Sequence, residues 1–214
     1  MLHLVELVKL YMFMTINLIE DKASIPSVYK KGYIGFGIHT CCLDGKLTKK
    51  YKVWYDMLMR CYSKKYQNKR PSYIGCTVDD KWLNYQVFAN WFENNYVESY
   101  ELDKDILFKG NKLYSESTCC FVPHSINLLL VNCVSRFGNL PIGVTLTPSN
   151  KYQANLNIKG IRTYLGTFVT IEEAFDIYLK AKKKEVTRQA ILYQKTLSIN
   201  CYTALLKYDI KITD

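Results

Sequence analysis

Residues 151–159 read KYQANLNIK, and this stretch decides the fold of the C-terminal part of the chain. Apolar and polar side chains alternate along it. The apolar set is Tyr152, Ala154, Leu156 and Ile158, and the polar set is Lys151, Gln153, Asn155, Asn157 and Lys159. Because successive side chains of a β-strand point to opposite faces, this period of two predicts a strand with one apolar face and one polar, basic face.

The residues that follow extend this strand into a small unit. Lys159 and Gly160 turn the chain into a second predicted strand, IRTYLGTF. Thr170 then begins a predicted helix, TIEEAFDIYLKAKKKEV, in which Thr170 and Glu173 form a capping box. The helix carries one apolar stripe, formed by Ile171, Ala174, Phe175, Tyr178 and Ala181. We therefore predict a three-stranded antiparallel sheet with one helix across it, which leaves the other sheet face bare.

The bare sheet face presents amides and bases in a regular array: Lys151, Gln153, Asn155, Asn157, Lys159, Arg162 and Tyr164. These side chains suit phosphate contacts and hydrogen bonds to base edges, and a small sheet fits the major groove of DNA. The alternative is an ordinary solvated sheet face, because such faces are polar as well.

The segment from Ile142 to about Val186 resembles the AP2 DNA-binding domain. The resemblance rests on IGV, KYQANLNI, YLGTF and TIEEAFDIYLKAK, and the most specific part is YLGTF followed by T-x-E-E-A. It implies a sheet that docks in the major groove of double-stranded DNA, with Arg162 and Tyr164 at DNA-contacting positions. Tyr152 stands on the packed side, where the family usually has tryptophan.

Upstream, the stretch LDKDILFKGN places Asp103, Lys104 and Asp105 side by side. We expect a short strand over residues 100–108, a turn at KGN, a second extended piece over 113–122, and then a helix. These elements together form a ββα unit. The adjacent opposite charges are also those of a turn stabilised by ion pairs, which is the alternative interpretation.

The helix of this ββα unit is expected to open at Pro123, because proline favours the first helical turn. It carries His124 and Asn127 three residues apart on one face. A carboxylate on a strand that faces an imidazole or an amide on a helix can hold one hard divalent ion. The alternative is a histidine on an ordinary helix surface.

Residues 50–132 resemble phage-type HNH endonucleases of the subgroup that often carries an AP2 domain. The resemblance rests on MLMRCY after Trp54, on VDDKWLNYQVFANWF, and on ELDKDILFKGNKLYSESTCCFVPHSIN. It implies that Asp103 and Asn127 bind Mg²⁺ or another divalent cation. It also implies that Thr118 takes the place of the central motif asparagine, which steadies the loop.

The family's first motif histidine, the general base that activates water, corresponds here to Lys104. A lysine has a reference pKa of about 10.4, so its ammonium group does not accept a proton at neutral pH. We therefore expect Lys104 to contact the scissile phosphate, with the metal, His124 or Asp105 activating the water. Otherwise the nuclease fold survives without efficient cleavage.

Three stretches precede the ββα unit. YKVWYDMLMRCY (51–62) predicts a helix whose inner positions are Val53, Met57, Leu58 and Cys61, with Trp54 flanking them. SKKYQNKRPSYIG (63–75) is polar and basic and predicts a loop that adds phosphate contacts. DDKWLNYQVFANWFENNY (79–96) predicts one helix with an aromatic core face, formed by Trp82, Val87, Phe88, Trp91 and Phe92.

Composition limits the class of protein. The 214 residues are 49% hydrophobic and 22% charged, as in globular domains, and the net charge of +10 favours nucleic acid over an anionic membrane as partner. The apolar stretch LHLVELVKLYMFMTINLI is interrupted by Glu6 and Lys9, so we expect an amphipathic helix and no membrane span or signal peptide. Eight cysteines without a CxxC pair are expected to be reduced, mostly buried thiols.

The predicted fold class is α+β, with an N-terminal extension (1–49), an HNH-like module (50–132), a linker (133–141), an AP2-like domain (142–190) and a tail (191–214). The sequence assigns no role to this tail, although its YTALLKYDIKI is compatible with a closing strand. The predicted function is a metal-dependent DNA endonuclease or nickase of the phage homing type, acting in the host bacterial cytoplasm. The alternatives are a catalytically degenerate DNA-binding regulator and an inhibitor that binds a host protein.

Overall fold

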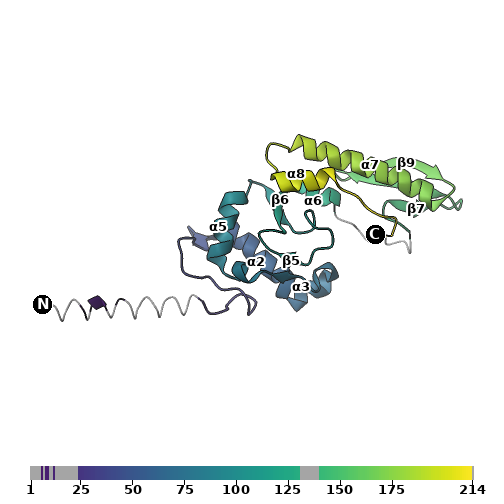
Figure 1. The fold of residues 1–214 in the computed structure, drawn as a ribbon. Coiled ribbons are helices and arrows are strands. Elements are labelled where there is room, and N and C mark those ends of the chain that lie inside the picture. Colours follow the sequence, from purple (N-terminus) through teal and green to yellow (C-terminus); the bar gives the residue numbers. More distant parts are fainter. Residues whose placement is uncertain (1–5, 7, 10–11, 13–23, 131–139, 214) are drawn as a thin grey trace. The chain divides into compact units, whose positions relative to one another are not determined.

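The computed structural model describes residues 6, 8–9, 12, 24–130 and 140–213 (Figure 1). The described chain mixes helices with small sheets, so the predicted α+β class is confirmed. Most of the amphipathic helix predicted within residues 2–19 and most of the linker predicted at 133–141 lie outside the described residues. No helix in the described ranges is long and apolar enough to cross a membrane.

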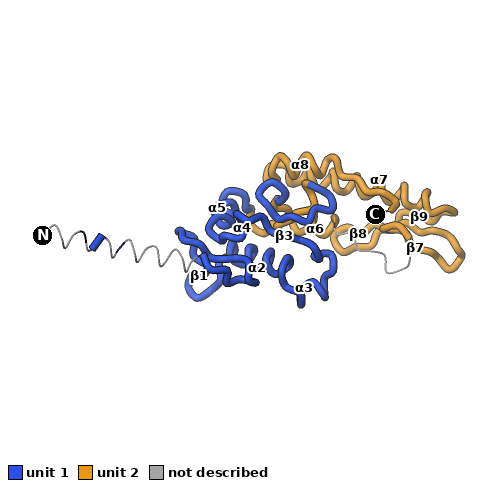
Figure 2. Tube along the Cα trace, turned by 60° about the horizontal axis from the view of Figure 1, so that its bottom comes forward, with its two compact units in different colours: residues 1–96, 108–119 blue, residues 97–107, 120–214 orange. Residues whose placement is uncertain are grey.

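The chain forms two compact units, each made of two separate stretches (Figure 2). The first unit comprises residues 1–96 and 108–119, and the second comprises 97–107 and 120–214. The segment predicted as one HNH-like module therefore contributes to both units. Its ββα core lies in the second unit, together with the C-terminal sheet.

Helix α2 (Lys49–Tyr62) organises the first unit. Thr48 begins the helix, because its side chain accepts a hydrogen bond from the Tyr51 amide. The predicted inner positions Met57, Leu58 and Cys61 are buried, and Trp54 is completely buried, whereas Val53 is only half-buried. The helix predicted at 51–62 is therefore confirmed, with Trp54 at the centre of its packed face.

The single helix predicted over 79–96 is wrong, because the structure forms two helices, α4 (Asp80–Leu83) and α5 (Tyr85–Asn95). Asn84 separates them. Its backbone is extended, and its side chain accepts the Gln86 amide as the N-cap of α5. On the predicted aromatic face, Val87 points outward and is 42% exposed, while Tyr85 is completely buried.

The loop predicted over 63–75 is also wrong. Helix α3 (Lys64–Lys69) and a 3₁₀ turn, η1 (Pro71–Tyr73), occupy most of it. Ser63 accounts for the difference, because its side chain accepts the Tyr66 amide and starts the helix despite the polar composition. No residue of α3 is buried, so its lysines remain at the surface.

Two small sheets complete the first unit. Strands β1 (Cys42–Leu43) and β2 (Lys46–Leu47) form an antiparallel hairpin, and β3 (Thr77–Val78) pairs in parallel with β5 (Leu113–Tyr114). Asp44 and Gly45 of the hairpin turn have φ values of 50° and 73°, as a two-residue type I′ turn requires.

The second unit begins with the predicted ββα order. Strand β4 (Tyr100–Asp103) pairs antiparallel with β6 (Cys120–Pro123), and α6 (His124–Leu130) follows directly. The predicted strand 100–108 is too long, because the chain turns at Asp103. The extended piece predicted over 113–122 is likewise interrupted, since β5 and β6 are separate strands.

The C-terminal sheet has the predicted architecture. Strands β7 (Val144–Leu146), β8 (Tyr152–Ile158) and β9 (Ile161–Phe168) are antiparallel in the order β7-β8-β9, and α7 (Ile171–Leu192) packs on them (Figure 1). The predicted capping box is present at the start of α7. The core between sheet and helix contains Ala154, Leu156, Ala174, Phe175 and Tyr178.

The tail, to which the sequence assigned no role, forms helix α8 (Ile199–Leu206) and packs on α7, so it is not a closing strand. Ser198 caps the helix by accepting the Cys201 amide, and Cys201 and Leu205 are buried four residues apart. Among the described cysteines, all are free thiols and most are buried, as predicted; the buried ones are Cys61, Cys76, Cys119, Cys120 and Cys201.

Candidate active site and nucleic-acid interface

A shared carboxylate joins strand β4 to helix α6. The Glu101 Oε1 atom lies 2.8 Å from His124 Nδ1, and Glu101 Oε2 accepts a hydrogen bond from Asn127 Nδ2. His124 and Asn127 project from one face of α6 because they are three residues apart. The structure therefore brings together two predicted site residues through Glu101, which the sequence analysis did not select.

Asp103 lies two residues after Glu101 and therefore on the same face of β4. Its Oδ1 accepts the backbone amides of Asp105 and Ile106, at 2.7 and 2.8 Å, which ends the strand. Both bonds use Oδ1, so Oδ2 is not engaged in this turn. Burial raises the pKa of the Asp103 carboxyl above its ordinary value, and the two backbone amides oppose that shift. A cation beside the carboxyl would favour its ionised form.

The donor chemistry of this face suits a hard divalent cation. Glu101 and Asp103 supply carboxylates from β4, Asn127 supplies an amide oxygen, and His124 supplies an imidazole. In the part of the chain that the structure describes, no three His, Cys, Asp or Glu side chains gather closely enough to hold a metal ion. Metal binding by Asp103 and Asn127 therefore stays a prediction.

Lys104 forms an ion pair with its neighbour Asp105. The Lys104 side chain is buried, and its Nζ lies 2.7 and 2.8 Å from the two carboxylate oxygens of Asp105. An ammonium group has three donors and no acceptor, so Lys104 in this state donates protons in hydrogen bonds and does not take one from water. Asp105 is half-exposed, and both of its oxygens contact the lysine.

Thr118 holds the turn that follows β5. Its Oγ1 donates to the Leu113 carbonyl at 2.7 Å and lies 3.1 Å from the Ser115 amide, which donates to it. The Ser115 hydroxyl is 2.9 Å from the same oxygen. These bonds close the turn on itself, and the motif role that the resemblance implies for Thr118 stays a prediction.

The register of β8 and β9 places the predicted DNA-contacting residues on one face. Asn155 lies opposite Tyr164, and Asn157 lies opposite Arg162, so these four side chains share a face of the sheet. The register shifts between Ala154 and Asn155, where Leu165 is the extra residue of a bulge. Beyond the shift, Gln153 lies opposite Thr167, so the polar face continues across the bulge.

We call the seven predicted residues the contact face: Lys151, Gln153, Asn155, Asn157, Lys159, Arg162 and Tyr164. None of them is buried, and Tyr164 is 61% exposed. Lys151 and Lys159 flank the two ends of β8. Because Ala154 and Leu156 pack towards α7 on the opposite side, the contact-face residues within β8 lie on the side of the sheet away from this helix. Lys159, in the turn after β8, instead lines a cavity together with α7 residues and lies near Glu185.

Comparisons of this chain with protein-family models, with curated proteins and with solved structures found no match. The candidate function therefore rests on the chemistry of the two sites described above, and the HNH and AP2 resemblances remain hypotheses based on sequence motifs.

Proposed function

We propose that this protein is a metal-dependent DNA endonuclease or nickase of the phage homing type. In this proposal the β4–β6–α6 unit is an HNH-like hydrolytic module, and the β7–β8–β9 sheet with α7 is an AP2-like DNA reader. The observation that carries the proposal is the Glu101 carboxylate, which holds His124 and Asn127 on the strand face that also bears Asp103. The net charge of +10 supports a polyanionic substrate.

The contact face supplies both kinds of DNA contact. Arg162, Lys151 and Lys159 are exposed cations suited to phosphates, which carry most of the affinity. Asn157 presents an exposed amide that can bond base edges in the major groove, whereas the Asn155 amide nitrogen is buried and its oxygen accepts Gln153 Nε2. Tyr164, beside Asn155 on the neighbouring strand, adds a hydroxyl and an apolar ring.

Asp103 and Asn127 are the residues that would hold Mg²⁺ or another divalent cation, with Glu101 beside Asn127. Such an ion, when bound, would supply Lewis-acid polarisation of the phosphate and of the attacking water. His124 is 67% exposed and oriented by Glu101, so it is placed to exchange a proton with substrate or solvent. Lys104 contributes positive charge next to this site, whereas Asp105 neutralises it.

The proposal is tested by nicking of a supercoiled plasmid pool that carries random-sequence inserts, with and without Mg²⁺. We expect metal-dependent nicking by the wild type and none by Asp103→Ala or Asn127→Ala. Glu172→Ala is the control, because Glu172 is exposed on the first turn of α7. Wild-type protein that binds the pool but never cuts it with any divalent ion would refute the enzyme.

The Lys104–Asp105 ion pair favours a second function. In the HNH resemblance, this position belongs to the general base. Here the two candidate catalytic groups, the Lys104 ammonium and the Asp105 carboxylate, are hydrogen-bonded to each other. We therefore also propose a DNA-binding regulator whose nuclease unit is catalytically degenerate. This alternative predicts sequence-selective binding that depends on Arg162 and Tyr164, with no cleavage of the bound DNA.

A further inference from the structure

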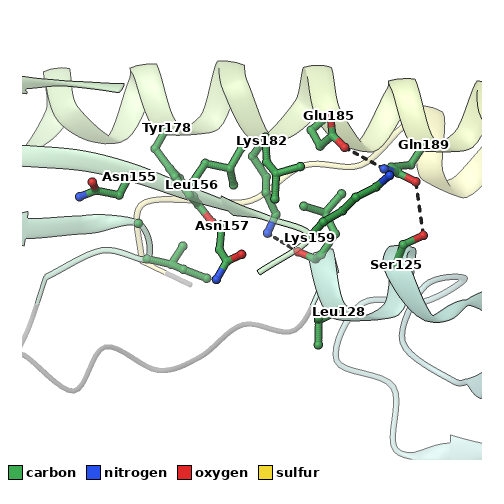
Figure 3. Close-up of a pocket in the computed structure, with 14 residues that line it drawn as sticks. Ser125, Leu128, Asn155, Leu156, Asn157, Lys159, Tyr178, Lys182, Glu185 and Gln189 are labelled. Carbon is green, nitrogen blue, oxygen red and sulfur yellow. Dashed lines mark hydrogen bonds between the residues drawn. The ribbon is translucent and has the colours of Figure 1, made fainter. Parts of the chain in front are cut away.

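Helix α7 is bonded to both ends of helix α6 (Figure 3). Near the start of α6, the Ser125 hydroxyl donates to Gln189 Oε1 at 3.4 Å. Near its end, the Leu129 carbonyl accepts a hydrogen bond from Lys182 Nζ. Lys182 and Gln189 are almost completely buried, with 4% and 2% of their surface exposed. We call these two contacts the α6–α7 joint.

The α7 residues of the joint extend the apolar inner stripe of this helix with polar side chains. Ala174 and Tyr178 pack under the sheet, and Lys182, Glu185 and Gln189 continue the same helix face one to three turns later. Buried polar groups are costly unless they are hydrogen-bonded, so their presence here requires partners. The partners of Lys182 and Gln189 include groups of α6. The inner face of α7 therefore changes from apolar to polar side chains at the point where the helix leaves the sheet and meets α6.

Glu185 fixes the orientation of Gln189. Its Oε1 accepts Gln189 Nε2 at 2.8 Å, so the amide oxygen of Gln189 is directed to Ser125. The Arg188 guanidinium, bonded to both Glu185 oxygens at 2.7 Å, holds the pKa of that carboxyl below its ordinary value. Glu185 therefore stays an acceptor, and Lys182 places a cation at the carbonyl end of α6, where the helix dipole favours it.

A cavity of about 380 Å³ lies beside the joint, and α6, β8 and α7 contribute its lining. The residues that line it make fewer packing contacts across it, so the hydrogen bonds of the joint contribute more to the position of α6 against α7. Strand β4 is tied to the same body, because the Tyr100 hydroxyl bonds Thr196 and its ring meets Tyr193 edge-on at 6.3 Å.

We propose that Lys182 and Gln189 are positioning residues that set the distance between the contact face and the candidate active site. Helix α7 covers the back of the sheet with its first half and holds α6 with its second half. Because α6 carries His124 and Asn127, DNA bound on the sheet meets the active site at one fixed offset. This inference rests on the proposed endonuclease function.

The experiment compares Lys182→Met and Gln189→Leu, which remove the polar groups at similar side-chain volume, with Lys180→Met. Lys180 is 71% exposed on α7 and serves as the matched control. For both joint variants we expect DNA affinity within about twofold of wild type, because Lys182 and Gln189 are buried and make no phosphate contact in this proposal. Single-turnover cleavage should fall about 10- to 100-fold, since small misplacements of catalytic groups are costly.

The positions of cleavage give a readout that a purely structural role would not move. On end-labelled duplex, wild type and Lys180→Met cut at one offset, whereas Lys182→Met cuts at several neighbouring phosphates. Lys182→Arg, which keeps a donor for the Leu129 carbonyl, restores the single offset. A parallel loss of affinity and cleavage, or a single offset in all variants, would overturn the positioning role.

Hydrogen exchange separates failure of this inference from failure of the proposed function. Without DNA, the backbone amides of α6 should exchange faster in Lys182→Met than in Lys180→Met, whether or not the protein cleaves. Equal exchange in the two variants overturns the joint. Faster exchange in Lys182→Met, together with a wild type that never cuts DNA, overturns the nuclease proposal and retains the joint.

Discussion

Glu101 on strand β4 accepts a hydrogen bond from the side-chain amide of Asn127 on helix α6, and the same carboxylate contacts His124. The interaction spans 26 residues of sequence and fixes the orientation of both α6 side chains. An amide whose nitrogen is bound to a carboxylate directs its oxygen the other way, which leaves that oxygen for another ligand. Glu101 is therefore the residue that would prepare Asn127 for a cation.

Replacing Glu101 by glutamine tests this preparation. The neutral side chain keeps the size but loses the charge that holds His124 and Asn127, so we expect metal affinity to fall about 10- to 100-fold. Titration with Mn²⁺ by calorimetry measures the change without requiring cleavage. Glu98→Gln, at an exposed turn before β4, is the control and should bind as wild type does. Equal affinity of all three proteins would remove Glu101 from the site.

Asp103→Asn should stabilise the folded protein at neutral pH. Burial raises the pKa of the Asp103 carboxyl in the fold, so ionisation of this group costs stability as the pH rises through that pKa. The contribution of Asp103 is therefore favourable below its ordinary pKa of 3.8 and is lost above the folded value. Asparagine keeps the Oδ1 acceptor for the turn and carries no charge.

The measurement for Asp103 is thermal unfolding across pH in the absence of divalent ions. The Asp103→Asn variant should melt above wild type at pH 7, and the two melting temperatures should converge as the pH falls below about 4. Asp105→Asn is the comparison, because its ion pair with Lys104 is removed and no gain is expected. A lower melting temperature for Asp103→Asn at pH 7 would contradict the burial argument.

Divalent ions should stabilise the wild type if Asp103 and Asn127 hold one. At 100 times the dissociation constant, a ligand of the native state adds about 2.7 kcal/mol to the unfolding free energy. We expect this increase in denaturant unfolding with Mg²⁺ or Mn²⁺ for wild type and Glu172→Ala. We expect it to be absent for Asp103→Ala and Asn127→Ala. Stabilisation of all four proteins alike would place the ion elsewhere.

DNA binding should separate the roles of Arg162 and Tyr164 on the contact face. Arg162→Ala should weaken binding and reduce the salt dependence by about one phosphate contact. Tyr164→Ala should weaken binding with the salt slope unchanged, because the tyrosine carries no charge. Affinity measured over a range of salt concentrations distinguishes the two. Lys180→Ala, on the far side of α7, is the control. DNA affinity that neither Arg162→Ala nor Tyr164→Ala changes would rule out the contact face.

The elements that the sequence predicted correctly are those whose signals are local. The alternation in residues 152–158 gave β8, and the capping box at Thr170 gave the start of α7. Two predicted strands were too long, because the chain turns at Asp103 and β5 and β6 are separate, and the errors in helices arose where a single cap outweighed composition. Asn84 divided one predicted helix, Ser63 started a helix in a polar stretch, and Ser198 started a helix in the tail.

The candidate site was predictable only in part. Asp103, His124 and Asn127 were identified from motif order, but Glu101 was missed although it precedes Asp103 by two positions on the same strand face. Its importance comes from a contact with α6 that no period in the sequence specifies. The burial of Lys104 could not be predicted from the sequence either, because an isolated charged side chain is usually exposed.

The sequence by itself determined which side chains share a face, because strand and helix periods are fixed by backbone geometry. It therefore determined the polar face of β8, the ββα order and the buried Ala174, Phe175 and Tyr178 of α7, whereas the predicted Ile171 and Ala181 are only half-buried. Only the tertiary structure decided which faces meet. Lys182 donates a hydrogen bond to the Leu129 carbonyl across 53 residues of chain, and Glu101 accepts one from Asn127 across 26. Such pairs depend on packing in three dimensions, which sequence periods do not specify.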